Sequence, residues 1–204
     1  MFKKKTGFWL LLCGIFPLLI AINTVVAEAH PHIFIDSSIE VVFDEKGLAG
    51  MQMTWIFDEM TSTGFFLDYD TDRNGSFSLK EKRILKQKAF DYLKNYEYMT
   101  HIEIDGKVFT ITYVKNFNPV IKHDRLVYRF FIPCHVTAHR QFKKISIAVY
   151  DEGYYVDFNQ NKRSVKLRGS DTFETTTRFW TNRNKSYYFE QFHPKEFILS
   201  FKNR

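Results

Sequence analysis

Apolar residues alternate with polar residues along most of the chain, which is the pattern of β-strands that are buried on one face. The first two alternating stretches, residues 32–43 and 47–58, are separated by a short polar turn and predict an antiparallel hairpin. A second hairpin is indicated where Asp105-Gly106 joins two further stretches, because this dipeptide suits a tight turn. The remaining alternating stretches are 126–132, 145–150, 154–158, 165–167, 173–179 and 197–201.

The period of the pattern changes between the first hairpin and the second. Residues 60–69 and 79–98 place apolar side chains at helical spacing, with a polar segment between them. We therefore expect an α+β fold, mainly an antiparallel β-sandwich, with a helix-loop-helix insertion at about 59–99 after the first hairpin. The length of 204 residues favours one β-rich domain over residues 30–204.

The amino-terminal region has the pattern of a secretory leader. Residues 1–7 carry three lysines, residues 8–27 are almost wholly apolar, and Ala27-Glu28-Ala29 supplies the small residues that a signal peptidase requires. We predict a cleaved signal peptide at 1–29, a periplasmic location and no stable membrane insertion after cleavage. The alternative is an uncleaved inner-membrane anchor facing the periplasm, because about 20 apolar residues can span a bilayer.

Composition and motifs exclude several classes of function. The formal net charge is +6, but the basic residues are scattered without a dense run, which favours a solvated surface and no nucleic-acid partner. Cys13 lies in the leader, so Cys134 alone remains in the mature chain and no internal disulfide can form. No phosphate-binding glycine loop, nucleophile elbow or zinc-protease helix is present, and we do not expect an enzyme.

Residues 70–81 match the calcium-binding loop of EF-hand proteins. Ca²⁺ takes about six to eight oxygen ligands, and alternating side chains on one tight curve supply several of them. Gly75 permits the sharp bend, and Glu81 is expected to close the site with both carboxylate oxygens. The predicted ligands are Asp70, Asp72, Asn74, Ser76, Ser78 and Glu81. The alternative is a polar turn that binds no ion.

A second candidate site lies at the start of the mature chain. In an extended segment His30 and His32 point to the same side, about 6.6 Å apart, and Asp36 lies further along that side. Cleavage would give His30 a free amine, and amine and imidazole nitrogens suit Cu²⁺, Ni²⁺ and Zn²⁺. The alternative is a frayed polar terminus without a metal.

Three segments together resemble a known bacterial family. They are the start His30-Pro31-His32-Ile33-Phe34-Ile35-Asp36, the loop 70–81 and the segment Tyr150-Asp151-Glu152-Gly153-Tyr154-Tyr155. They are similar to proteins of unknown function labelled "ABC-type uncharacterised transport system, periplasmic component". The resemblance covers most of residues 30–158, although members commonly have Asp-Pro where this chain has Glu152-Gly153.

The resemblance implies an exported protein that accompanies nickel, cobalt or zinc transporters, with His30, His32 and Asp36 as motif residues. We therefore expect a calcium-stabilised, periplasmic metal-handling accessory that assists an inner-membrane transporter and holds Ni²⁺, Co²⁺, Zn²⁺ or Cu²⁺. The alternative is a calcium-stabilised protein–protein interaction module of the envelope that binds through its aromatic surface and has no transition-metal role.

Overall fold

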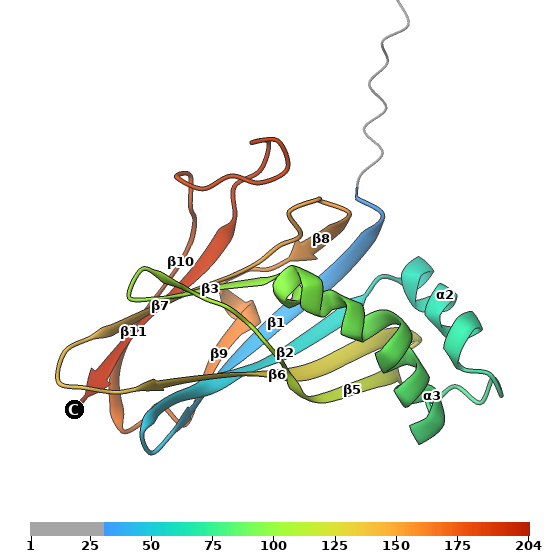
Figure 1. The fold of residues 1–204 in the computed structure, drawn as a ribbon, viewed down its shortest axis with the longest axis horizontal. Helices are drawn as coiled ribbons and strands as arrows, with labels where there is room; N and C mark the ends of the chain where they lie inside the picture. Colours follow the sequence, from blue (N-terminus) through green and yellow to red (C-terminus); the bar gives the residue numbers. More distant parts are fainter. Residues whose placement is uncertain (1–30) are drawn as a thin grey trace, which may run out of the picture. The chain divides into compact units, whose positions relative to one another are not determined.

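The computed structural model describes residues 31–204, which form two β-sheets and one helix-rich region (Figure 1). Sheet A contains β1 (Ile33–Asp44), β2 (Gly47–Phe57), β5 (Lys115–Lys122), β6 (Arg125–Thr137), β8 (Val156–Asn159) and β9 (Val165–Arg168). Sheet B contains β3 (Thr100–Ile104), β4 (Lys107–Phe109), β7 (Lys143–Val149), β10 (Phe173–Thr181) and β11 (Lys195–Asn203).

Most strand pairs are antiparallel, and the predicted hairpin of β1 and β2 is confirmed. Its turn is held by the Asp44 carboxylate, which accepts hydrogen bonds from the backbone N–H groups of Lys46 and Gly47. On its other side β1 pairs in parallel with β8 and then with β9. The order of sheet A is therefore β5-β6-β2-β1-β8, with β9 also beside β1, and sheet B runs β10-β11-β7-β3-β4.

The two sheets contribute to one hydrophobic core. Strand β1 buries alternate residues from Ile35 to Phe43, as its sequence pattern predicts. At the far end of β1 the Phe43 ring lies 5.3 Å from the Phe173 ring and 5.2 Å from the Phe201 ring, both in sheet B. Sheet B thus covers this end of the inner face of sheet A.

The helix-rich region contains α2 (Glu59–Tyr69), α3 (Leu79–Leu85), a π-helical turn (Lys86–Phe90) and a 3₁₀ segment (Asp91–Met99). Residues 79–98, predicted to be helical, do form a helical segment, but its type changes along the chain and Tyr96, Glu97 and Tyr98 leave helical geometry. Leu85 and Phe90 are both fully buried, and only a π turn brings residues five apart onto one face. Burial of both side chains on one face therefore favours a π turn over a regular α-helix at this point.

This region covers the other end of the inner face of sheet A, on the side of β5 and β6 (Figure 1). The Phe90 ring stacks on Phe117 of β5 at 3.7 Å and meets Tyr128 and Phe130 of β6 edge-on. The α2 residue Phe65 lies against Phe57 and Tyr128. The structure thus supports the prediction of a mostly β fold, with two antiparallel-rich sheets and a single helix-rich region.

The Ser62 hydroxyl ties α2 to sheet A. It donates to the Asp58 carbonyl and accepts a 2.9 Å hydrogen bond from the backbone N–H of Leu126 in β6. Within residues 31–204 no helix has the length and apolar character needed to cross a membrane. The predicted leader lies outside the described residues.

Replacing Phe90 with Ala should lower the free energy of unfolding by about 3–5 kcal/mol, because the vacated volume lies in the packed core between helix and sheet. Urea denaturation of both proteins measures this loss. The matched control is Tyr92→Ala, two residues away, whose ring is 60% exposed; it should cost less than about 1 kcal/mol. Equal losses would contradict the role given to Phe90.

Candidate functional site

Three acidic side chains converge in the loop between α2 and α3. One carboxylate oxygen from each of Asp70, Asp72 and Glu81 lies within 4.8 Å of the others. Asp70 is only 6% exposed and Glu81 only 4% exposed, and no lysine or arginine of residues 31–204 pairs with either. Buried carboxylates that repel one another are stabilised by a cation. Carboxylate oxygens are ligands for hard cations, so these three residues form a candidate metal site.

The backbone of the loop is curled by the carboxylate of Asp70. It accepts hydrogen bonds from the N–H groups of Asn74 at 3.2 Å and Gly75 at 2.9 Å. Gly75 has φ of 77°, a left-handed conformation that glycine adopts at little cost. The Asn74 side-chain oxygen in turn accepts from the N–H and hydroxyl of Ser76. These bonds keep the polar side chains on the inside of the turn.

Glu81 links the two ends of the loop. Its Oε1 accepts from the N–H and hydroxyl of Thr71, and its Oε2 accepts from the N–H and hydroxyl of Ser78. These bonds lower the pKa of Glu81 to about 2, and the bond from the Thr71 hydroxyl has the largest effect on it. Ser78 also caps α3 through a capping box with Glu81. The hydroxyl predicted to be a calcium ligand is therefore bonded to another predicted ligand.

The predicted amino-terminal site is placed only in part. His30 lies outside the described residues. The exposed His32 ring lies 4.9 Å from the Tyr155 ring, because the start of β1 runs beside the residues that precede β8. Asp36 accepts a 2.9 Å hydrogen bond from the Asn159 side chain and lies 3.9 Å from Arg125. The structure thus places His32 next to Tyr155, in the third segment of the resemblance, whereas Asp36 contacts Asn159 and Arg125.

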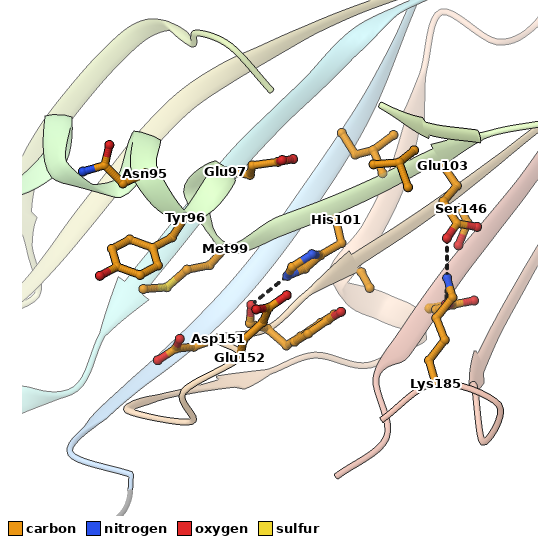
Figure 2. A pocket seen from close by; sticks show the side chains of 15 residues that line it. Asn95, Tyr96, Glu97, Met99, His101, Glu103, Ser146, Asp151, Glu152 and Lys185 are labelled. Carbon is orange, nitrogen blue, oxygen red and sulfur yellow. Dashed lines mark hydrogen bonds and ion pairs between the residues drawn. The ribbon is translucent and has the colours of Figure 1, made fainter. Parts of the chain in front are cut away.

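A cavity of about 440 Å³ opens on the outer face of sheet B (Figure 2). Its floor includes His101 and Glu103 from β3 and Ser146 and Ala148 from β7. The turn around Glu97 and the loop at 150–152 form its walls. These residues come from distant parts of the sequence, so their spacing along the chain could not predict this cavity.

One end of the cavity holds a compact charge cluster. Lys185 donates to Glu103 at 2.6 Å and to Glu196 at 3.0 Å, and Asn182 donates to Glu196 at 2.9 Å. Glu196 is only 3% exposed. Burial opposes its charge, but the hydrogen bonds from Asn182 and Lys185 outweigh burial and lower the pKa of Glu196. Burial likewise opposes the charge on Lys185, whose pKa is nevertheless raised by its two carboxylate partners.

The other end is built around His101. Its ring stacks on Tyr150 at 3.9 Å, and its Nε2 lies 3.2 Å from the Tyr150 carbonyl oxygen. A carbonyl only accepts, so Nε2 carries a proton and Nδ1 is the basic nitrogen of the neutral ring. Burial lowers the pKa of His101. Glu97 and Glu152 line the same cavity.

The cavity wall is strained. Glu97, Tyr98 and Met99 have φ of 48°, 52° and 50°, three successive left-handed residues without a glycine. Such conformations cost about 1–3 kcal/mol each and concentrate at functional sites. The strained run places Glu97 and Met99 at the cavity beside His101.

Comparison with known proteins gives a family but no activity. The family described as "Protein of unknown function (DUF1007)" matches residues 15–188. The chain belongs to this DUF1007 family. An "Uncharacterized 15.5 kDa protein in trpE 3'region" of Spirochaeta aurantia is 30% identical over 129 residues, which are 63% of this chain and 91% of that protein. An "Uncharacterized protein" of Haemophilus influenzae is 26% identical over 140 residues, which are 67% of this chain and 66% of that protein.

Replacing Lys185 with Met should destabilise this DUF1007 protein by about 1–3 kcal/mol at pH 7, because Glu196 then keeps a buried charge without its cation. The folded-state pKa of Glu196 is lowered, so its contribution is present above the unfolded pKa and is lost as the pH falls. The difference in the free energy of unfolding between the wild type and the Lys185 variant should therefore become smaller below about pH 4.

Urea denaturation at pH 7 and pH 3.5 measures both effects. Lys144→Met is the control, because this exposed lysine on the neighbouring strand forms no ion pair with a residue of 31–204. A Lys185 variant as stable as wild type at pH 7 would show that the cluster contributes nothing to folding.

Proposed function

We propose that this DUF1007 protein is a calcium-stabilised metal-handling accessory that acts in the periplasm. The observation that carries the calcium part is the convergence of carboxylate oxygens from Asp70, Asp72 and Glu81, two of them buried without a cationic partner in residues 31–204. The side-chain oxygen of Asn74 and the carbonyl of Ser76 would complete an oxygen shell. Ca²⁺ would supply the positive charge that this shell lacks.

The proposed ion has a structural task that follows from its position. Asp70 directly follows α2, and Glu81 lies in the first turn of α3. Both helices belong to the region that covers one end of sheet A, where Phe77 of the loop is buried close to Phe66. Holding the two loop ends together therefore keeps this cover on the sheet.

Adding Ca²⁺ should raise the midpoint of thermal unfolding. An ion present at about one hundred times its dissociation constant adds about 2.7 kcal/mol, which corresponds to about 5–11 °C for a chain of this size. Scanning calorimetry of the chelated protein with and without Ca²⁺ measures the shift. Glu81→Gln should abolish most of it, because the variant loses a charged ligand.

The matched control for the calcium experiment is Glu59→Gln, an exposed acid at the start of α2 and outside the loop. It should retain the full calcium-dependent shift. A wild-type protein whose midpoint does not respond to Ca²⁺ would rule out the calcium site, and a loss of the shift in both variants would show that it is a general charge effect.

The transition-metal part of the proposal is supported by two sets of nitrogen donors. His30 and His32 provide one at the predicted mature terminus. His101 provides the other as a single nitrogen, with its proton held on Nε2 by a carbonyl and with Glu97 and Glu152 lining the same cavity. Within residues 31–204 the acidic loop alone brings three possible ligand atoms together. Such an orienting bond is typical of histidines that bind metals. By resemblance, the partner would be an inner-membrane transporter of nickel, cobalt or zinc.

Calorimetric titration with Ni²⁺, Co²⁺, Zn²⁺ and Cu²⁺ should detect binding, and two variants should separate the donor sets. The double change His30→Ala and His32→Ala removes the terminal set, and His101→Ala removes the cavity set. Loss of one imidazole ligand should weaken the affected site by about tenfold or more. His139→Ala is the control, because this exposed histidine lies outside both sets. A wild-type protein that binds none of the four ions would refute this part alone.

The second candidate is an interaction module of the envelope without a transition metal. It is favoured by the aromatic segment at Tyr187–Phe192, in which Phe189 is 87% exposed and Tyr188, Phe189 and Glu190 have left-handed φ. A large exposed ring on a strained backbone is suited to contact with another protein. The metal titration separates the two candidates, because the interaction module does not need to bind a transition metal.

A further inference from the structure

The outer face of sheet A carries a flat row of polar side chains. Ser38 of β1 pairs with Thr54 of β2, Thr54 pairs with Arg129 of β6, and Arg129 pairs with Asn118 of β5. Directly paired residues point to the same face, and neighbouring strands are about 4.8 Å apart. These four side chains therefore form one row, which extends about 14 Å across the sheet.

A hollow of about 650 Å³ lies over this row. Four cationic residues line it, namely Arg129, Arg163, Lys166 and Arg168. Its one carboxylate is Glu40, which pairs with Arg168 at 2.9 Å. No acidic residue of 31–204 forms an ion pair with any of the other three. The fold thus brings four basic residues from separate parts of the sequence to one positively charged hollow.

The positive charges lie at two opposite ends of the hollow. Arg129 is on β6, whereas Lys166 is on β9, where its backbone is in register with Glu40 of β1. Strands β2 and β1 lie between β6 and β9, so the two cations start about 14 Å apart. Extended away from each other, two such side chains reach different negative groups of one ligand. The spacing therefore fits an extended ligand with several negative groups.

The side chains between the charged ends define the ligand further. They are hydroxyls and amides, including those of Ser38, Thr54 and Gln52, which suit the hydroxyl groups of a sugar. No aromatic residue lines the hollow, so it lacks the rings on which nucleic-acid bases stack. We propose that the outer face of sheet A binds an extended anionic glycan.

This site is separate from the acidic loop and from the cavity on sheet B, with which it shares no residue. The ligand's carboxylates or sulfates would pair with Arg129 at one end and with Arg163 and Lys166 at the other. Its sugar hydroxyls would bond to the polar row between them. Glycan binding would give an exported protein a fixed place on a polysaccharide layer whether or not it handles metals.

The test measures binding of the protein without its predicted leader to polygalacturonate in about 0.1 M salt. Neutral dextran, polyaspartate and single-stranded DNA are the comparison ligands. The double variant Arg129→Gln with Lys166→Gln should raise the dissociation constant for polygalacturonate about tenfold or more. The matched control is Lys88→Gln with Lys94→Gln, which removes the same charge from exposed positions in the helix-rich region. It should change the dissociation constant less than about twofold.

A third variant separates glycan recognition from general charge. Thr54→Val keeps the shape of the side chain and removes its hydroxyl, so it should weaken polygalacturonate binding and leave any polyaspartate binding unchanged. The proposal is overturned if polygalacturonate does not bind, or if polyaspartate or DNA binds as tightly. It is also overturned if the control double variant weakens binding as much as Arg129→Gln with Lys166→Gln. Circular dichroism of each variant checks that the fold is intact.

Discussion

The inner face of sheet A is the constraint on which the rest of the structure depends. Strands β1, β2 and β6 of this sheet have 12, 11 and 13 residues and bury large side chains on this face, Trp55, Tyr128 and Phe130 among them. Sheet B covers the end near Phe43, and the helix-rich region covers the end near Tyr128. Without the helical cover, several large aromatic side chains would be exposed to water at a cost of about 1.5–3 kcal/mol each. The helices are therefore part of the core of this small domain.

The acidic loop is placed where this cover is weakest. Helix α2 has eleven residues and α3 has seven, lengths at which isolated helices are not stable in water. Both are held by what they pack against and by the loop that joins them. A cation bound by that loop would stabilise the cover and, through it, the aromatic core beneath. The proposed calcium would thus act on folding, while the outer faces of the two sheets remain available for ligands.

The sequence was a good guide to local structure and a poor guide to distant contacts. The β1–β2 hairpin, the helix-rich region and the three converging acidic residues could be predicted, because each depends on residues close together in the chain. The parallel pairing of β1 with β8 could not, since it joins residues 123 positions apart, as Asp36 and Asn159 show. The His101 cavity was missed for the same reason. The π turn could not be predicted because tertiary packing, and not helical periodicity, determines where Phe90 lies.

The central position of β1 has a consequence for how the chain matures. This strand starts only three residues after His30, yet one of its edges is occupied by β2 and the other by β8 and β9. Sheet A cannot be completed until the chain as far as Arg168 has left the ribosome or crossed a membrane. Until then the free edge of β1 offers unpaired N–H and C=O groups to any neighbouring strand. Strand β1 thus gains one partner from its own hairpin but waits for the other until much of the domain is present, and a chaperone that shields an extended strand edge would serve it in that interval.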